Sequence, residues 1–160
     1  MTYQNEPEMI YVVVFSLDNI EYCCDVSNIL EFINLMKITH IPQLPDCVEG
    51  VINLRGRIIN VFNLRKCLDI KPVITDTTRI MIIEFKKEHI GIIVDSILEI
   101  TLVPVTEIDD IPKDLKARDY IKGIYKNGDR ILIFIDLGTV LNSTGFNNSN
   151  QNKEKNSIHV

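Results

Sequence analysis

Apolar and polar residues at the start of the chain form two short β-type runs followed by a helical pattern. Residues 10–17 are β-branched and aromatic on both faces, and after a polar turn pair the apolar run at 20–26 provides a hairpin partner. Ser27 or Asn28 can cap a short helix that reaches about residue 34, because the apolar and acidic positions there fall on different sides of a helix. The chain therefore opens with a predicted strand, strand and short helix.

A proline-containing connection leads from this unit to a hairpin. Residues 37–47 hold two prolines, which lack the N–H that a central strand needs, so this segment is predicted to run over the surface. Apolar runs at 51–54 and 58–64 flank Arg-Gly-Arg at 55–57, and a glycine between β-type runs is typical of a hairpin turn. No turn requires arginine beside its glycine, so the two arginines are the first candidates for function.

A helix signal and a polar loop follow the hairpin. Asn63 can cap a short helix at 64–68. Residues 71–78, rich in Thr, Asp and Pro, are the best candidate for a boundary between lobes. Strands at 79–85 and 90–94 then open the second half of the chain.

The rest of the second half is interpreted as strands joined by polar segments. Residues 96–100 fit either a short helix or a continuing strand, and residues 107–119 fit a solvated loop. Runs at 120–126 and 130–136 make the clearest hairpin, because the Asn-Gly pair between them favours a type I′ turn. Residues 137–141 can close as a helical turn.

The predicted organisation is one domain at 9–141, with lobes at roughly 9–70 and 79–141 between which strands can be exchanged. Residues 1–8 are polar and acidic and are expected to be flexible, and residues 142–160 are expected to be a disordered tail of Asn, Ser, Lys and Gln. The start of the chain lacks the pattern of a secretory signal. Its longest apolar run is far below the roughly 18 to 20 residues of a membrane helix.

Short segments recur in the same order in both halves of the chain. Val-Ser-Asn-Ile-Leu-Glu at 26–31 matches Val-Asp-Ser-Ile-Leu-Glu at 94–99, and Val-Glu-Gly-Val at 48–51 matches Ile-Lys-Gly-Ile at 121–124. This duplication favours two small β-barrel lobes packed together, with chance similarity among β-patterns as the alternative.

The duplication separates shared features from features of one copy. Gly50 and Gly123 recur, and seven residues after each comes an arginine, Arg57 or Arg130. Features present in both copies are predicted to be structural. Arg55 falls opposite a glycine in the other copy, so Arg55 is the arginine predicted to carry function.

Composition narrows the class of partner. With 160 residues, 46% hydrophobic content and a net charge of −5, the chain is expected to be a soluble globular protein. The negative charge argues against broad binding to nucleic acids or anionic membranes, so proteins are the expected partners. Four cysteines without a C-x-x-C pair are expected to be buried free thiols in a reducing cytoplasm.

The chain has no motif of a common catalytic site. It lacks a phosphate loop, a G-x-S-x-G elbow and an H-E-x-x-H pair. His40, His89 and His159 do not have the spacing of metal ligands, and the acidic residues at 107–110 fit a solvated loop better than a cation site. We therefore expect no enzyme activity, no catalytic residue, no cofactor and no metal.

A basic cluster lies at and after the hairpin turn. Arg55, Arg57, Arg65 and Lys66 have no acid between them, which raises RNA binding as an alternative. Only Phe62 could supply base stacking there, and stacking provides much of the affinity for single strands. A protein-binding face is therefore the preferred interpretation.

Several of these segments together resemble the CheW family of chemotaxis coupling proteins. They are Ile-Leu-Glu at 29–31, Gly-Val-Ile-Asn-Leu-Arg-Gly at 50–56, Asn-Leu-Arg at 63–65, Gly-Ile-Ile-Val-Asp at 91–95 and Tyr-Ile-Lys-Gly at 120–123. The resemblance covers about residues 9–141. Asn60 and Asn63 replace a proline and an aspartate that the family usually has, which bears on local charge and partner choice.

The resemblance implies a mostly β fold of two SH3-like five-stranded β-barrel lobes packed together, with short helices. It also implies a non-enzymatic cytoplasmic adaptor that joins the regulatory domain of a CheA-type histidine kinase to the cytoplasmic tip of methyl-accepting transmembrane chemoreceptors, in arrays. No nucleic acid and no membrane insertion are implied. Alternatives are the same fold in a pilus or gliding pathway and a CheW-like module of another signalling complex.

The resemblance assigns partner binding to a small set of positions, namely Ile29, Glu31, Gly50, Asn53, Leu54, Arg55 and Gly56. It implies that Glu31, on the short helix, pairs with Arg55, and that the two glycines shape the hairpin. Ile29 is expected near the groove used for the receptor. We therefore expect an apolar groove between the lobes, bordered by Ile29 and the hairpin, that takes a receptor helix.

Overall fold

The computed structural model describes residues 6–112, 114 and 118–145, which lie mostly in short strands. The first half contains β1 (Met9–Leu17), β2 (Ile20–Asp25), the 3-10 turn η1 (Val26–Asn28), β3 (Ile29–Asn34), β4 (Val48–Leu54), β5 (Arg57–Asn63) and α1 (Leu64–Cys67). The second half contains β6 (Arg79–Phe85), β7 (Glu88–Val94), β8 (Ser96–Pro104), the 3-10 turn η2 (Val105–Glu107), β9 (Ile108–Asp109), β10 (Ile121–Asn127), β11 (Arg130–Ile135) and α2 (Leu137–Ser143). Most of the predicted N-terminal segment and tail, residues 1–5 and 146–160, lie outside the described residues.

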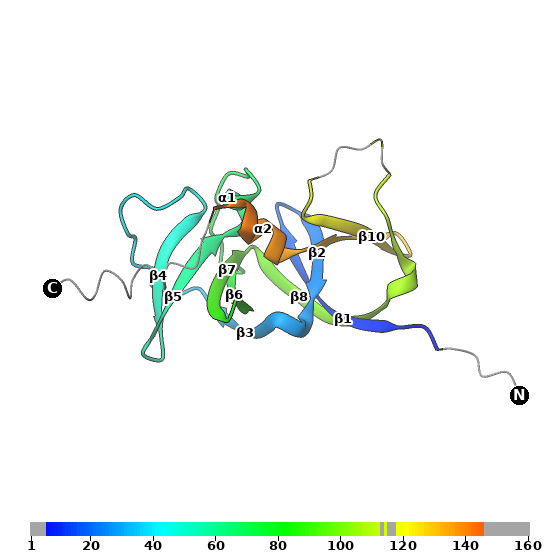
Figure 1. The fold of residues 1–160 in the computed structure, drawn as a ribbon, viewed down its shortest axis with the longest axis horizontal. Coiled ribbons are helices and arrows are strands. Elements are labelled where there is room, and N and C mark those ends of the chain that lie inside the picture. Colours follow the sequence, from blue (N-terminus) through cyan, green and yellow to red (C-terminus); the bar gives the residue numbers. More distant parts are fainter. Residues whose placement is uncertain (1–5, 113, 115–117, 146–160) are drawn as a thin grey trace, which may run out of the picture.

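The strands form two sheets, which lie side by side as two lobes (Figure 1). The six-stranded lobe has the order β8-β1-β2-β11-β10-β9, and the five-stranded lobe has the order β3-β6-β7-β5-β4. The prediction of a mostly β fold with two lobes is confirmed. The short β9 adds a sixth strand to one of the two lobes that were expected to have five.

Each lobe takes strands from both halves of the chain. The chain leaves the six-stranded lobe at η1 and returns to it at Asp95, so β3 pairs with β6 and β8 pairs with β1. The loop at 71–78 is not the predicted lobe boundary, because β5 before it and β7 after it belong to one sheet. The predicted lobes 9–70 and 79–141 are therefore corrected to 9–25 with 96–135 and to 29–94.

Strand pairing confirms the internal repeat. The strand order of one lobe becomes that of the other, apart from β9, when each strand is replaced by its repeat counterpart. The counterparts of β1, β2, β3, β4 and β5 are β6, β7, β8, β10 and β11. Each lobe has one parallel pair, β5 with β7 or β11 with β2. A bulge between Ile29 and Glu31 also recurs, between Ile97 and Glu99. Apart from β9, each lobe thus combines three strands of one copy with two strands of the other.

Gly50 and Gly123 have the same steric role in the two lobes. A Cβ atom on Gly50 would lie 2.1 Å from the carbonyl oxygen of Thr39, and a Cβ atom on Gly123 would lie 2.8 Å from that of Asp109. In each lobe a neighbouring segment therefore runs directly against the glycine backbone. The prediction that the two glycines are structural is confirmed.

The largest apolar core lies between the lobes. It takes buried side chains from both sheets and both helices, among them Phe15, Leu64, Met81 and Val140. Each lobe also encloses a smaller core, rich in isoleucine in the five-stranded lobe and in valine in the six-stranded lobe. Because the main core is shared, the two lobes form one folding unit.

The predicted helix at 27–34 is wrong. Only Val26–Asn28 is helical, as one 3-10 turn capped by Asp25, and Ile29–Asn34 is strand β3. Residues of β3 are alternately half-buried and exposed, which is the two-residue period of a strand. Pairing of the β3 backbone with β6 therefore outweighs the local helix signal.

Three other local predictions are refined. Residues 96–100 lie in strand β8, which settles an ambiguity left by the sequence. The β10–β11 turn is Gly128-Asp129, of which only Gly128 has positive φ, at 62°, so the predicted type I′ turn is wrong. Helix α2 runs to Ser143, two residues beyond the predicted helical turn.

The four cysteines are free thiols, and Cys67 alone is not fully buried. Burial raises the pKa of Cys23 and Cys24 to about 12, which keeps both thiols protonated and unreactive. Within the described part of the chain, no helix is long and apolar enough to cross a membrane.

Candidate partner-binding site

The tip of the β4–β5 hairpin is a two-residue turn made by Arg55 and Gly56. Their φ angles are 52° and 84°, and a type I′ turn needs positive φ at both positions. The side chain of Asn53 accepts a hydrogen bond from the amide of Gly56 at 2.9 Å, which holds the turn. Positive φ costs a non-glycine residue about 1 to 2 kcal/mol, so the turn itself gains nothing from arginine at this position.

Glu31 on β3 and Arg55 at the hairpin tip form an ion pair, in which Arg55 Nη2 donates to Glu31 Oε1. The pair joins the edge strand β3 to the turn that follows β4, the strand at the other edge of the sheet. The Arg55 and Glu31 side chains are 69% and 32% exposed, so the pair contributes only about 0 to 1 kcal/mol to stability. It fastens the hairpin tip to β3. The pair expected from the resemblance is therefore present, with Glu31 on a strand instead of a helix.

A hollow of about 460 Å³ lies beside this ion pair. We call it the hairpin hollow, and it is lined by Leu30, Glu31, Leu54, Arg55, Arg57, Ile59, Ile82 and His89. Ile59 and Ile82 are buried and form an apolar floor, while Arg55 and Arg57 are exposed and Glu31 is half-buried at the rim. An apolar centre with a polar rim is the usual anatomy of a protein interface.

The seven expected partner-binding residues do not form one surface. Glu31, Leu54 and Arg55 line the hairpin hollow, with Gly56 in the adjacent turn and Asn53 hydrogen-bonded to it from β4. Gly50 is buried against Thr39, so it supports the hairpin and offers no surface to a partner.

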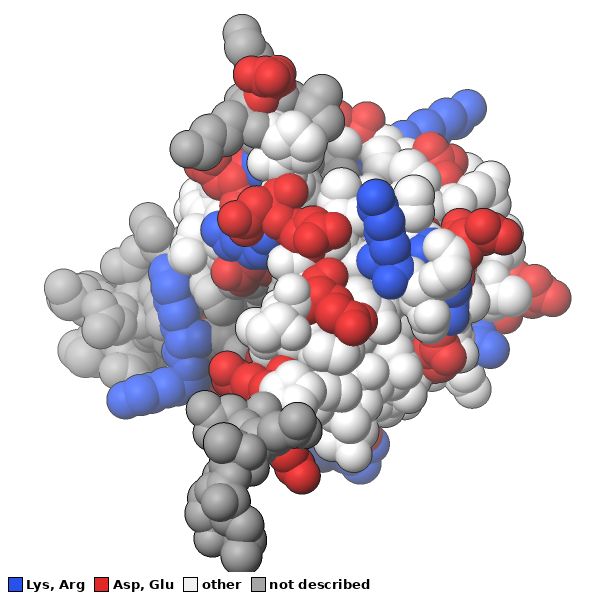
Figure 2. Space-filling view, turned by 90° about the vertical axis from the view of Figure 1, so that its right-hand side faces the viewer, with Lys and Arg blue, Asp and Glu red and all other residues white. Residues whose placement is uncertain are grey.

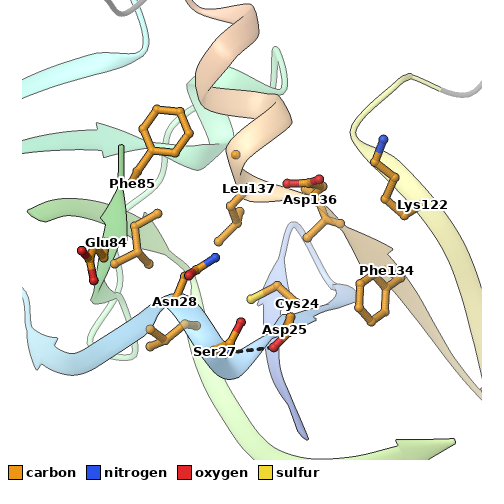
Figure 3. A pocket seen from close by; sticks show the side chains of 14 residues that line it. Cys24, Asp25, Ser27, Asn28, Glu84, Phe85, Lys122, Phe134, Asp136 and Leu137 are labelled. Atoms are coloured by element: carbon orange, nitrogen blue, oxygen red, sulfur yellow. Dashed lines mark hydrogen bonds between the residues drawn. The ribbon is translucent and has the colours of Figure 1, made fainter. Parts of the chain in front are cut away.

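Ile29 lines a different hollow of about 310 Å³, which we call the interlobe pocket (Figure 3). Its walls come from both lobes, with Cys24, Phe85 and Phe134 among them, and the turn of Leu137 closes one side. The hydrogen bond from the Ser27 amide to Asp25 Oδ1, at 2.8 Å, holds the crossing turn at its edge (Figure 3).

The prediction of one groove bordered by both Ile29 and the hairpin is wrong. The bulge in β3 places Ile29 opposite Ile83 and Glu31 opposite Ile82. Ile29 and Ile83 line the interlobe pocket, whereas Glu31 and Ile82 line the hairpin hollow. One inserted residue, Leu30, therefore separates the two surfaces.

Three of the four cations in the basic cluster are paired with carboxylates. The pairs are Arg55 with Glu31, Arg65 with Asp95 at 2.6 Å, and Lys66 with Glu49 at 2.7 Å. Arg57 instead donates to Nδ1 of His89 at 2.6 Å. This internal pairing reduces the positive charge that the cluster offers to a phosphate backbone.

Asn63 explains one departure from the family pattern. Its side-chain oxygen accepts from the amide of Arg65 at 3.1 Å, and its side-chain nitrogen donates to Glu49 at 3.1 Å. An aspartate could not donate this second bond. Burial would raise the pKa of Glu49, but the hydrogen bonds from Lys66 and Asn63 and the charge of Lys66 hold it below its usual value.

The charge distribution at the other end of the molecule is mixed. Figure 2 shows acidic side chains interspersed with uncharged surface and a few cations over the end formed by the six-stranded lobe. Among the described residues, no group of three His, Cys, Asp or Glu side chains is arranged to hold a metal ion.

Comparison with known proteins identifies the family. Residues 11–145 match the CheW-like domain model. The chain belongs to the CheW family. It is 35% identical over 133 residues to the chemotaxis protein CheW of Bacillus subtilis (strain 168), covering 81% of this chain and 85% of the relative. It is 33% identical over 130 residues to the chemotaxis protein CheW of Thermotoga maritima, covering 81% and 86%.

A solved CheW-family structure shares the fold. The scaffolding protein TtCheW from Thermoanaerobacter tengcongensis is 33% identical and superimposes with a TM-score of 0.76, covering 85% of this chain and 93% of that chain. The two-lobe architecture is therefore that of a CheW-family chemotaxis scaffold protein.

Proposed function

We propose that this protein is a non-catalytic cytoplasmic adaptor that couples transmembrane chemoreceptors to a CheA-type histidine kinase. The observation that carries the proposal is the Glu31–Arg55 pair, which orients an Asn-Leu-Arg-Gly hairpin at the rim of the hairpin hollow on a CheW-family fold. An exposed pair of this kind adds little stability, so its orientation is better explained by a partner than by folding.

The interlobe pocket is the proposed site for a helix from the receptor tip. Ile29, Ile83 and Phe134 give this pocket an apolar lining drawn from both lobes. Phe32 and Ile100 are exposed at equivalent repeat positions, paired with the interlobe core residues Met81 and Val13. An amphipathic helix laid between the lobes would cover such side chains.

The hairpin hollow is the proposed site for the regulatory domain of the kinase. Because β3 and β6 present Ile29 and Ile83 to one pocket and Glu31 and Ile82 to the other, the two sites share no lining residue. Receptor and kinase could therefore be held at the same time, which is what coupling requires. Contact with the membrane would be indirect, through the receptor.

Reconstitution tests this function directly. The protein is mixed with its cognate kinase and a receptor cytoplasmic fragment, and kinase autophosphorylation is measured with and without the protein. We expect receptor control of the kinase only when all three are present. If the receptor controls the kinase equally well when this protein is omitted, the proposal is refuted. The genes next to this one can show whether the protein serves a chemotaxis, pilus or gliding pathway.

A further inference from the structure

Arg57 and Arg130 hold equivalent positions in the two lobes but have different partners. Each opens the second strand of its hairpin, seven residues after Gly50 or Gly123. Recurrence alone predicts a structural role for both arginines. The contacts of the two side chains lead to a different conclusion for Arg57.

Arg130 is held by two carboxylates. Its Nε donates to Glu21 Oε2 at 2.8 Å and its Nη2 donates to Glu21 Oε1 at 3.1 Å, so the guanidinium and carboxylate make a two-bond pair. Its Nη1 also donates to Glu99. The side chain is 35% exposed. In the six-stranded lobe this arginine is therefore satisfied within the chain.

In the five-stranded lobe, neither of the two equivalent positions supplies Arg57 with a carboxylate partner. The match of 26–31 with 94–99 puts His89 at the place of Glu21 and Glu31 at the place of Glu99. Glu31 is paired with Arg55, and His89 offers Arg57 only its ring nitrogens, Nδ1 at 2.6 Å and Nε2 at 3.2 Å. Within the described residues, no carboxylate lies within ion-pair distance of Arg57.

We propose that Arg57 recognises an acidic side chain of the kinase regulatory domain, which enters the hairpin hollow and takes the place that Glu21 has on Arg130. This inference rests on the proposed function and adds the chemistry of the contact. Arg57 is exposed and lines the hollow, so its guanidinium is accessible to a partner. The planar fork of arginine matches a carboxylate through two parallel hydrogen bonds.

The surroundings of Arg57 favour a protein carboxylate. Leu30 is 45% exposed at the same hollow, and Leu54 is half-buried beside it, so an acidic residue with apolar neighbours would be covered on docking. Removal of water around the pair would then strengthen the charge interaction. Arg55 adds a second cation at the rim, while Glu31 faces Arg55.

The test compares three variants of the full chain for binding to the isolated regulatory domain of the cognate kinase. Arg57→Gln removes the proposed contact. Arg130→Gln removes the same charge at the equivalent place in the other lobe and is the matched control. His89→Glu supplies Arg57 with an internal carboxylate, as Glu21 does for Arg130. Affinity is measured by calorimetry from about 50 to 200 mM salt, a range over which exposed charge interactions are increasingly screened.

We expect Arg57→Gln to weaken kinase binding by roughly 10-fold and to reduce its salt dependence, as loss of an interfacial charge pair does. His89→Glu should weaken binding to a similar extent while Arg57 is still present, because the arginine is then already satisfied. Arg130→Gln should lower the melting temperature, since it leaves Glu21 and Glu99 unpaired, but should keep the wild-type salt dependence.

The outcomes separate this inference from the function on which it rests. If the wild-type chain does not bind the kinase domain at all, the proposed function fails. If the wild-type chain binds and Arg57→Gln binds with the same affinity and salt dependence, Arg57 is not a contact and only the inference fails. Equal weakening by Arg57→Gln and Arg130→Gln would mean a general effect of charge, and would also overturn it.

Discussion

Arg65 and Asp95 form a two-bond ion pair at the point where the chain returns from the five-stranded to the six-stranded lobe. Arg65 donates from Nε to Asp95 Oδ1 at 2.7 Å and from Nη2 to Asp95 Oδ2 at 2.6 Å. The amide of Asp18 donates to the same carboxylate at 2.8 Å. Three segments far apart in the sequence therefore meet on one side chain, which ties helix α1 and the β1–β2 turn to the crossing.

Asp95→Asn is expected to destabilise the protein by about 2 to 3 kcal/mol at neutral pH. The Arg65 side chain is only 12% exposed, so loss of the Asp95 carboxylate leaves a largely buried cation with only the more distant Asp18, at 3.8 Å, to balance its charge. The estimate is below that for a fully buried pair, because 21% of the Asp95 side chain is exposed. Urea unfolding of both proteins measures the difference, and Asp129→Asn in the exposed turn is the matched control.

The effect of Asp95→Asn should depend on pH. Burial alone would raise the pKa of Asp95, but the hydrogen bonds from Arg65 and the Asp18 amide and the charge of Arg65 hold it below its usual value. The stability that the ionised carboxylate contributes is then fully present above the ordinary pKa of aspartate, roughly 3.9, and is lost as pH falls through the lower folded value. A constant difference between wild type and variant down to the lowest pH at which both fold would contradict this account.

Gly50→Ala should cost about 3 kcal/mol, whereas Gly56→Ala should cost about 1 kcal/mol. Both glycines have positive φ, but a Cβ on Gly50 would clash with the Thr39 carbonyl oxygen and a Cβ on Gly56 would meet no atom within 4 Å. Chemical unfolding of the two single variants measures the contrast. Equal losses would mean that backbone conformation, and not contact with residue 39, makes glycine necessary at position 50.

The parts of the fold that follow from local sequence were predictable. The hairpin at Arg55 and the Asn63 cap depend on residues within a few positions of each other, and both are present. The repeat was visible because its bulges and glycines need particular residues, such as Gly50 and Gly123. The Glu31–Arg55 pair was implied by a family motif and not by the local pattern.

The parts that depend on distant pairing were not predictable. Residues 29–34 have a short apolar run that fits a helix or a strand, and only the partner β6 decides between them. The two crossings of the chain between the lobes, before β3 and before β8, have no local signal in the sequence. The separation of Ile29 from Glu31 arises from one bulged residue, Leu30, whose effect appears only after pairing.

Arg57 shows that recurrence of a residue does not fix its contacts. Its position recurs as Arg130, which predicts a structural role, but the identity of its neighbours is set by Glu31 and His89, 26 and 32 positions away. The signal was in the sequence, since His89 stands where the other copy has Glu21. This difference can be recognised only when the two copies are aligned in the correct register.

Arg55→Glu is expected to abolish kinase control while leaving the fold intact. The substitution places two carboxylates side by side at positions 31 and 55, which should turn the hairpin away from β3. The stability cost should be within about 1 kcal/mol, because both side chains are partly exposed. Circular dichroism melting and kinase activity in the reconstituted complex measure the two effects.

The double variant Glu31→Arg with Arg55→Glu is the control for orientation. It restores an ion pair of opposite direction, so the hairpin should return to its place while the charge at the tip stays reversed. Recovery of kinase control would mean that the orientation of the hairpin matters most. Continued loss would mean that the partner recognises the charge of Arg55. A large fall in melting temperature for Arg55→Glu alone would contradict the assignment, since the pair would then be structural.

Ile29→Asp is expected to weaken binding of a receptor fragment by at least 10-fold, because it places a carboxylate in the apolar lining where the receptor helix would lie. Ile97→Asp is the matched control. Ile97 is the repeat counterpart of Ile29 and also packs partly buried against the interlobe core, but it does not line the interlobe pocket. The two variants should therefore lose similar stability and differ in receptor affinity, measured by co-sedimentation with receptor fragments. Unchanged affinity in Ile29→Asp would exclude this pocket as the receptor site, and equal weakening in both would trace the effect to packing between the lobes.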